Sequence, residues 1–359
     1  MNAPRIAWLP DGRRLHMNHG PIDLIVEAFG ADGERDAAYR QAAARFATIL
    51  EELVAELPEL RSPASDRPRR FAGSTARRMA AAASRFSDGG AVFVTPMAAV
   101  AGAVADEVLA AMIEGRALDR AYVNDGGDIA VHLAPGASLR LAIGGKDETM
   151  ADRVLVCAED GVRGVATSGW RGRSHSLGIA DAVTVLGPDA ASADVAATLI
   201  ANAVDLPGHP AIGRTAAREL APDSDLGERL VTVSVGALSA DEVDAALERG
   251  LVVAEDFRRR GWIEAAALFL SGEARVCAGA SERLALRDTP LWPAGHLPLK
   301  GGERLSPSPR SLPNVAGCSA AAKPPISPLE GEMAGRPEGG AVERRLPNKP
   351  IEYKETPHA

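Results

Sequence analysis

Cysteine is scarce in this chain of 359 residues, and its scarcity excludes two kinds of architecture. The three cysteines, Cys157, Cys277 and Cys318, are isolated in the sequence and form no C-x-x-C pair. A small domain held together by disulfides and a zinc site built from paired thiols are therefore both excluded. Free thiols of this kind are typical of a reducing cytoplasm.

The chain also lacks a signal peptide, an evident membrane span and an excess of positive charge. Residues 1–10 contain no apolar core of the kind that a signal peptide needs, and we expect that no stretch of about 18 apolar residues exists to span a membrane. The formal net charge of −8 argues against nonspecific binding to nucleic acid or anionic membranes, because both require clustered cations. We expect a cytoplasmic protein with neither kind of partner.

Proline and glycine are abundant but unevenly placed, and they divide the chain in two. Thirteen of the 25 prolines lie in residues 281–359. A segment of that composition cannot bury enough apolar surface to offset the entropy lost on ordering, so we expect a disordered tail there. Residues 1–280 are long enough to bury a core, and we expect them to form one α+β domain.

Hydrophobic periodicity predicts the α+β class, in which helices pack on a mostly antiparallel sheet. Thr95 and Pro96 are typical of a helix start, and Ser239 with Glu242 forms a capping box for a helix that Gly250 ends. The predicted helices span residues 34–57, 74–86, 96–114 and 239–250, and the predicted strands include residues 5–9, 22–29, 91–94, 121–123 and 230–235.

A further predicted helix begins after Asp189 and carries two oxygen-bearing side chains on one face. Asp194 and Thr198 lie one helical turn apart. Their oxygens could help to hold a hard cation such as Mg²⁺, which takes few protein ligands and completes its shell with water and phosphate. In the alternative interpretation, Asp194 is an exposed helix acid and Thr198 bonds back to the helix backbone. Spacing alone leaves both interpretations open.

A glycine-containing turn joins two predicted strands. The segment Asn124-Asp-Gly126-Gly127-Asp128 favours positive φ, and its glycines allow a backbone to approach a ligand closely. It is either a hairpin turn and nothing more, or a turn that also contacts a ligand.

A second polar turn, Thr167-Ser168-Gly169, can present hydroxyl and N–H groups to a phosphate or a flavin edge. Arg171, Arg173 and His175 follow within a few residues and add positive charge suited to a diphosphate. The alternative is an ordinary solvated loop.

These motifs occur in an order and at spacings that resemble the FAD:protein FMN transferases, the ApbE family. The resemblance covers about residues 90–205, and a wider likeness to an uncharacterised ApbE-like branch runs from about residue 5 to about residue 280. The segments that carry it are 98–106, 124–128, 166–169, 183–185 and 193–198, and the wider likeness adds 20–23, 95–99 and 169–173.

The resemblance implies an ApbE-like fold with a flavin nucleotide site that contains Mg²⁺. The implied metal ligands are the backbone carbonyl of Ala98 and the side chains of Asp194 and Thr198. The implied activity is cleavage of the FAD diphosphate, by hydrolysis or by transfer of FMN to a protein acceptor. The residues implied to contact FAD are Asn124, Gly126 and Gly127, and the local chemistry described above adds Thr167, Ser168, Gly169 and Arg173 as candidate contacts.

The chain departs from the family pattern at two places. Ala101 stands where the family has a lysine before glycine, so one phosphate-directed charge is missing. The family's His-Ile-Asp-Pro-Arg-Thr-Gly segment is not recognisable, and only His175 can stand in for its histidine as a general base. Asp181 either replaces the missing carboxylate or caps a turn. Two functions remain: a magnesium-assisted enzyme acting on FAD through His175, or a non-catalytic binder of a flavin nucleotide on the same scaffold.

Overall fold

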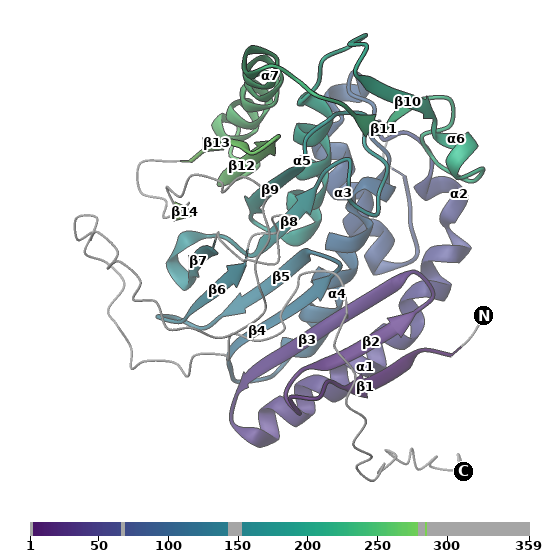
Figure 1. Ribbon diagram of the computed structural model, residues 1–359. Coiled ribbons are helices and arrows are strands. Elements are labelled where there is room, and N and C mark those ends of the chain that lie inside the picture. Colours follow the sequence, from purple (N-terminus) through teal and green to yellow (C-terminus); the bar gives the residue numbers. More distant parts are fainter. Residues whose placement is uncertain (1–2, 66–68, 143–152, 279–283, 286–359) are drawn as a thin grey trace, which may run out of the picture.

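A single large sheet organises the chain. The computed structural model describes residues 3–65, 69–142, 153–278 and 284–285. The sheet has nine strands in the order β1-β2-β3-β4-β5-β8-β9-β12-β13, and all neighbouring strands are antiparallel (Figure 1). The strands are β1 (Arg5–Trp8), β2 (Leu15–His19), β3 (Ile22–Gly30), β4 (Leu118–Asp125), β5 (Asp128–Leu133), β8 (Gly164–Ser168), β9 (Ala182–Gly187), β12 (Ala265–Leu270) and β13 (Glu273–Cys277).

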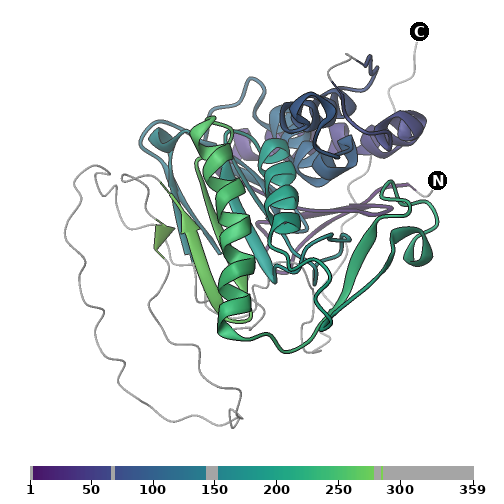
Figure 2. The same ribbon diagram turned by 90° about the horizontal axis from the view of Figure 1, so that it is seen from above.

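Helices cover one face of this sheet, so the predicted α+β class is confirmed (Figures 1 and 2). Helices α1, α4, α5 and α7 bury apolar side chains against the strands, and α3 packs on α4 and α5. The helices are α1 (Asp32–Ala55), α2 (Leu57–Leu60), α3 (Ser74–Phe86), α4 (Val100–Ile113), α5 (Ala190–Ala203), α6 (Ala217–Leu220) and α7 (Ala240–Arg259), with short 3₁₀ turns η1 (Asp88–Gly90), η2 (Pro96–Ala99) and η3 (Ala158–Asp160).

A smaller sheet covers part of the opposite face. It contains β6 (Ser138–Ala142), β7 (Arg153–Cys157) and β14 (Leu284–Ala285). Val154 and Val156 of β7 pack with Ile129, Val131 and Val165 of the large sheet in a second apolar cluster. Strands β10 (Ile212–Ala216) and β11 (Leu230–Val235) form a separate two-stranded ribbon, which projects beyond α5 in Figure 2.

Strand alternation decides which side chains face the helices. In β4, Ala121 and Val123 belong to the helix-side core, and Tyr122 between them packs with the second cluster. Because alternate residues share a face, Asp125 continues the Ala121–Val123 row toward the helices. Asp128 lies directly opposite Asp125 in the β4–β5 register and shares that face.

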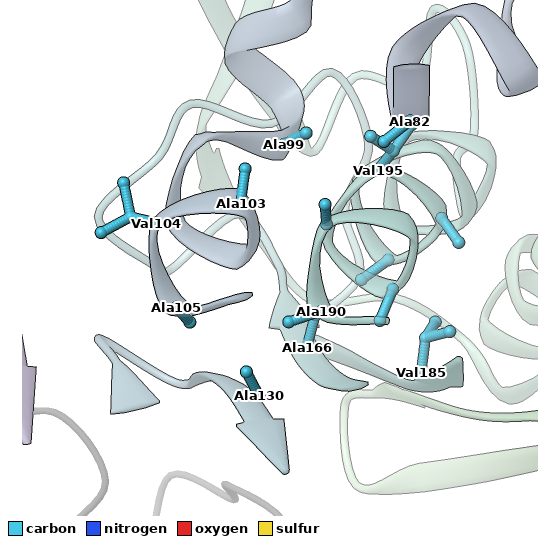
Figure 3. Packing of buried hydrophobic residues seen from close by; sticks show 14 of the residues in the cluster. Ala82, Ala99, Ala103, Val104, Ala105, Ala130, Ala166, Val185, Ala190 and Val195 are labelled. Carbon is cyan, nitrogen blue, oxygen red and sulfur yellow. The ribbon is translucent and has the colours of Figure 1, made fainter. Parts of the chain in front are cut away.

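Small residues allow α4 and α5 to touch. A Cβ placed on Gly102 of α4 would lie 2.2 Å from the carbonyl oxygen of Ala190 in α5, so only glycine fits there. Figure 3 shows the same contact region, with Ala103 and Ala190 on the two helices and Ala130 and Ala166 on the strands below. The alanine-rich sequence therefore serves close packing of two helices over the centre of the sheet.

The predicted helix over residues 96–114 consists of two pieces. Thr95 caps it as expected, since its hydroxyl accepts a hydrogen bond from the N–H of Met97 at 3.2 Å. The first turn is the 3₁₀ segment η2, and the α-helix α4 follows. The stretch Pro96–Ile113 has a mean hydropathy of 1.6 and is long enough to cross a membrane, which corrects the expectation that no such run exists. It is 56% buried inside the protein, as a core helix is.

Two other local predictions are wrong. Residues 91–94 are not a strand, because the N–H groups of Ala91 and Val92 bond to Asp88 and Ser87 and continue a turn. Gly250 does not end its helix, which continues to Arg259. A Cβ on Gly250 would lie 2.3 Å from a methyl group of Val204, so this glycine permits close packing. The predicted tail, residues 281–359, lies outside the described residues except for 284–285.

Candidate functional site

Three carboxylates come together between the sheet and the starts of α4 and α5. Asp125 ends β4, Asp128 begins β5, and Asp194 lies in the second turn of α5. The charge of Asp128 raises the pKa of Asp125, that of Asp194 raises the pKa of Asp128, and that of Asp125 raises the pKa of Asp194. We call Asp125, Asp128 and Asp194 the acid cluster. The β4–β5 hairpin and helix α5, which is distant from it in sequence, together assemble the cluster.

Asp194 links α5 to the first turn of α4. Its Oδ2 accepts a hydrogen bond from the N–H of Gly102 at 3.1 Å. In return, the carboxylate of Asp106 in α4 accepts hydrogen bonds from the N–H groups of Ala190 and Ala191, at 3.1 and 2.9 Å, in the first turn of α5. Each helix thus supplies an acceptor for N–H groups that have no partner within the other helix. A negative charge is also favourable at a helix N-terminus.

Burial and like charges shift the proton affinities of these groups. Burial raises the pKa of Asp194 to about 7, with further increases from Asp125 and Asp106, while the N–H of Gly102 lowers it. Burial also raises the pKa of Asp106 to about 7. The pKa of Asp128 is raised well above its ordinary value by burial and by Asp194, against the N–H of Thr167, which donates to Asp128 at 3.2 Å. As whole residues, Asp106, Asp128 and Asp194 are partly exposed.

Arg173 brings positive charge to the cluster. Its guanidinium lies over the β4–β5 turn, where a Cβ on Gly126 would be 2.5 Å from Nη2. It lowers the pKa of both Asp125 and Asp128. Arg173, predicted to bring positive charge from the 170–175 loop, therefore lies beside the predicted glycine turn, and the two sequence motifs form one site.

The glycine turn is a two-residue hairpin loop. Gly126 and Gly127 have φ values of 63° and 120°, which explains why both positions are glycine. The side chain of Asn124 closes the turn, since its Oδ1 accepts a hydrogen bond from the N–H of Gly127 at 2.9 Å. By alternation Asn124 lies on the sheet face opposite to Asp125.

The Thr167–Gly169 turn is divided between the two faces of the sheet. Thr167 shares the face of Val165, and its hydroxyl is hydrogen-bonded to that of the buried Thr184 at 2.9 Å. Its backbone N–H reaches Asp128, so Thr167 contributes to the acid cluster through the main chain. Ser168 takes the helix side by alternation and is partly exposed.

Gly169 and Asp181 have a packing role. A Cβ on Gly169 would lie 2.4 Å from the carbonyl oxygen of Asp181. The carboxylate of Asp181 is ion-paired with Arg171 at 2.8 Å and accepts the N–H of Ser271 at 2.7 Å. Asp181 therefore anchors the loop to the β12–β13 turn, and of the two predicted interpretations the structure supports the turn cap.

His175 lies apart from the hydrogen bonds of the site. Its side chain is exposed, and within the described residues it makes no hydrogen bond or ion pair. The loop around it is held elsewhere, because Asn202 of α5 accepts the N–H of Leu177 at 2.8 Å and Arg214 donates to the carbonyl of Leu177. The assignment of His175 as a general base stays a prediction.

The predicted metal ligands come from two neighbouring elements. Ala98 lies in η2, which packs against α5, the helix that carries Asp194 and Thr198. Ala98 and Thr198 are partly exposed. Among the described residues no group of three or more His, Cys, Asp or Glu side chains is placed to hold a metal ion. The predicted set contains one carboxylate, one carbonyl and one hydroxyl, a donor set of hard oxygens that suits Mg²⁺ with water and phosphate as further ligands.

Asp106 and Asp125 received no role in the sequence interpretation. The signal for Asp125 was available, because it follows Ala121 and Val123 at a spacing of two and so belongs on the buried face. No comparable signal existed for Asp106, whose partners Ala190 and Ala191 are more than eighty residues away. These contacts require the packing of α4 on α5.

The fold and the site define an α+β protein with a deep acidic site beneath the starts of two core helices. The family model described as "AbpE bacteria" matches residues 6–276, and the chain belongs to this family. The predicted membership of an ApbE-like branch is therefore confirmed.

Relatives of this chain include archaeal proteins named UPF0280. The protein of Methanothrix thermoacetophila is 38% identical over 161 residues, which are 44% of this chain and 64% of that protein. The protein of Archaeoglobus fulgidus is 34% identical over 146 residues, which are 39% of this chain and 57% of that protein. The chain thus spans less than two thirds of the length of these relatives.

Solved structures similar to this chain include two ApbE proteins. Pseudomonas stutzeri flavinyl transferase ApbE, in its apo form, is 15% identical with a TM-score of 0.43 and covers 78% of this chain and 97% of its own. The Thermotoga maritima ApbE protein is 11% identical with a TM-score of 0.43 and covers 77% of this chain and 98% of its own. At these scores the likeness carries no argument about ligands, and the family assignment rests on the family model.

Proposed function

We propose that this protein binds FAD with the help of Mg²⁺ and cleaves the FAD diphosphate, releasing AMP and either FMN or an FMN-modified protein acceptor. The observation that carries the proposal is that Asp128 interacts electrostatically with both Asp194, which accepts the N–H of Gly102 in α4, and Arg173, which lies over the β4–β5 turn. These groups belong to the motifs that resemble the family's nucleotide site. Asp128 and Asp194 are partly exposed as whole residues, and Arg173 is exposed.

The charge balance supports a requirement for a divalent cation. Asp106, Asp125, Asp128 and Asp194 together outnumber Arg173, and Ala101 supplies no compensating charge. Without a bound cation, ionised carboxylates at the site would repel a diphosphate. A bound cation would favour the ionised form of Asp194 and so oppose the rise in its pKa that burial causes. Mg²⁺ would supply charge neutralisation at the diphosphate when bound.

The residues of this chain would have distinct tasks. Asp194 and Thr198, with the carbonyl of Ala98, would hold the cation, and the guanidinium of Arg173 would bind a phosphate oxygen. Gly126 and Gly127 add no side chains of their own at the β4–β5 turn, where a nucleotide would meet the guanidinium of Arg173.

A non-catalytic flavin nucleotide binder is the second candidate. Two observations favour it: Ala101 stands in place of a lysine, and the exposed His175 makes no hydrogen bond within the described residues. Under this alternative the acid cluster and Arg173 still bind the nucleotide, and no bond is broken.

The release of AMP distinguishes the two candidates. Purified protein is incubated with FAD and MgCl₂ or with FAD and EDTA, and AMP is quantified by liquid chromatography over several hours. The proposed function predicts that AMP is released in the incubation with MgCl₂ and is not released in the incubation with EDTA. FAD binding without AMP release under either condition would exclude the enzyme and leave the binder. The cytoplasmic location and the protein acceptor stay predictions that this assay does not address.

A further inference from the structure

The loop between α6 and β11, residues 221–229, is joined to the segment that leads into η2. The hydroxyl of Thr95 donates a hydrogen bond to the carboxylate of Asp225, which lies 130 residues further along the sequence. Beside this contact, the guanidinium of Arg229 lies 3.2 Å from the centre of the Phe93 ring. Two side-chain contacts therefore hold the loop against the chain at the point where η2 begins.

The loop has a fixed shape of its own. The N–H of Ala217 donates to the carbonyl of Arg229 at 2.9 Å, and the N–H of Arg218 donates to the carbonyl of Gly227 at 3.0 Å. The antiparallel pair of β10 and β11 lies on either side of this turn in the sequence. Asp225 is thus presented to Thr95 by a turn with backbone hydrogen bonds of its own.

The buried hydroxyl of Thr95 makes two hydrogen bonds. Thr95 is 2% exposed. Its hydroxyl donates its only proton to Asp225 and, as the N-cap of η2, accepts the N–H of Met97 at 3.2 Å. Because a hydroxyl has one proton and two lone pairs, a fixed acceptor for the proton leaves a lone pair for Met97. Without Asp225, the buried hydroxyl would lose its acceptor and the cap its fixed orientation.

This cap also fixes the place of Ala98, a predicted ligand of the cation. The N–H of Ala98 donates to the carbonyl of Thr95 at 3.1 Å. Helix α4 has Ala99 as its N-cap, so the first carbonyl to accept an α-helical hydrogen bond in α4 is that of Ala99. In a continuous α-helix the N–H of Gly102 would donate to the carbonyl of Ala98, but here it donates to Asp194. The carbonyl of Ala98 therefore lies outside the hydrogen bonds of α4, as suits a carbonyl that serves a cation.

We propose that Asp225 is a positioning residue of the cation site: by fixing the hydroxyl of Thr95, it holds η2 in the conformation in which the carbonyl of Ala98 can serve as a ligand. The inference rests on the proposed function and gives the β10–β11 ribbon a part in it. Asp225 acts through Thr95 and contacts neither the cation nor FAD. Residues that hold a metal ligand in place in this way typically change metal affinity by about 10–100-fold when they are replaced.

The test measures binding in the full-length chain and needs no turnover. FAD affinity is measured by quenching of flavin fluorescence at a series of MgCl₂ concentrations and in EDTA. The series gives the Mg²⁺ concentration at which FAD binding is half-maximal, which we call the Mg²⁺ requirement. Thermal unfolding checks that each variant is folded.

Four variants separate the hydrogen bond from the charge and from the ribbon. Asp225→Ala and Thr95→Val each remove the hydrogen bond, and Thr95→Val, which keeps the shape of the side chain, decides the test if Asp225→Ala does not fold. Asp225→Asn removes the charge and keeps an acceptor oxygen. Glu219→Ala is the matched control, because it removes another hydrogen bond between a threonine and a carboxylate of the ribbon, which Thr215 donates to the exposed Glu219 at 2.5 Å.

The expected result is a change in the Mg²⁺ requirement alone. Asp225→Ala and Thr95→Val should raise it at least ~10-fold, as loss of a residue that holds a metal ligand does, and should leave FAD affinity in EDTA unchanged. Asp225→Asn should restore most of the loss, because its amide oxygen still accepts the hydroxyl proton. Glu219→Ala should behave as the unmodified protein.

Four results would overturn the inference, and they are distinguishable. An unchanged Mg²⁺ requirement in Asp225→Ala and Thr95→Val would remove Asp225 from the cation site and leave the proposed function standing. An FAD affinity that falls equally with MgCl₂ and in EDTA would make the contact a purely structural one. A loss in Asp225→Asn as large as in Asp225→Ala would show that the charge acts and the hydrogen bond does not. FAD binding by the unmodified protein that is independent of Mg²⁺ would reject the proposed function, and the inference with it.

Discussion

The carboxylate of Asp194 and the backbone N–H of Gly102 join two core helices at the point where the candidate site lies. Their hydrogen bond, at 3.1 Å, occupies the first turn of α4, and the contact of Gly102 with Ala190 brings the two helices together there. Asp106 makes the reciprocal contact with the start of α5. The same residues therefore determine the packing of the core and the position of the acid cluster.

Replacing Gly102 should weaken the fold. Gly102→Ala gains about 1 kcal/mol of helix propensity, but its methyl group would meet backbone atoms of Ala190 and Ala191 that cannot move aside. We expect a net loss of roughly 1–3 kcal/mol in the free energy of unfolding, measured by urea denaturation. Gly33→Ala is the matched control, because Gly33 lies in α1 with no atom within 4 Å of its Cβ position. Equal stability of the two variants would contradict the close contact.

Asp194→Asn distinguishes a metal ligand from a helix link. An asparagine oxygen can still accept the N–H of Gly102, while the negative charge is lost. If Asp194 holds Mg²⁺, the free energy of FAD binding in the presence of Mg²⁺ should be less favourable in the variant by roughly 1–3 kcal/mol. The free energy of FAD binding in EDTA should change little. Isothermal titration with and without Mg²⁺ measures both values. If Asp194→Asn and the unmodified protein bind FAD equally well, both with Mg²⁺ and in EDTA, then Asp194 serves helix packing alone.

Much of the fold could be predicted because local sequence controls it. Thr95, Asp189 and Ser239 each cap the helix that they were expected to cap. Residues 121–123 of β4 were expected to be a strand, period-two alternation identified β5, and the Gly126–Gly127 pair identified the turn between them. The errors occurred where packing overrides propensity. Gly250 looks like a helix end, but it is a point of contact with Val204.

The site was predicted only in part, since its geometry depends on contacts distant in sequence. Arg173 and Gly126 were both named, and their direct contact could not be foreseen. The opposite orientation of Thr167 and Ser168 follows from strand alternation, but the sequence motif alone suggested that both hydroxyls face one ligand. The acid cluster combines the β4–β5 hairpin with α5, and no spacing rule links the hairpin to this helix.

The buried acids should make stability depend on pH. The pKa of Asp125 is about 8 in the folded protein, so the folded state keeps a proton there that the unfolded chain has released. Because the unfolded state then binds fewer protons, the contribution of Asp125 to stability falls as the pH rises from about 4 to about 8. Asp125→Asn should remove this contribution and raise the free energy of unfolding at pH 7.5 by roughly 1–4 kcal/mol.

Urea denaturation at pH 5 and pH 7.5 measures the free energy of unfolding of Asp125→Asn and of the unmodified protein. The increase in this free energy caused by Asp125→Asn should be larger at pH 7.5 than at pH 5. Asp119→Asn, at an exposed acid near the other end of the same strand, should give no such difference. A stability loss in Asp125→Asn at both pH values would show that the ionised carboxylate contributes to the fold.

Residues 286–359 should be dispensable for the folded domain. The family match ends at residue 276, and the strand pair of Leu284 and Ala285 with β7 would be kept in a chain that ends at Ala285. We expect the melting temperature of the shortened chain to stay within about 3 °C of that of the full chain. Circular dichroism during heating measures it. A larger decrease would show that the removed residues stabilise the domain and would overturn the predicted division at residue 280.

The claim on which the whole account depends is that this protein binds FAD in a Mg²⁺-dependent manner. An equilibrium titration that follows flavin fluorescence, with protein added to FAD in MgCl₂ and in EDTA, tests it most directly. We predict saturable binding of one FAD per chain, at least ~10-fold tighter with Mg²⁺, a difference of about 1.4 kcal/mol. No saturable binding of FAD in either buffer would contradict the account.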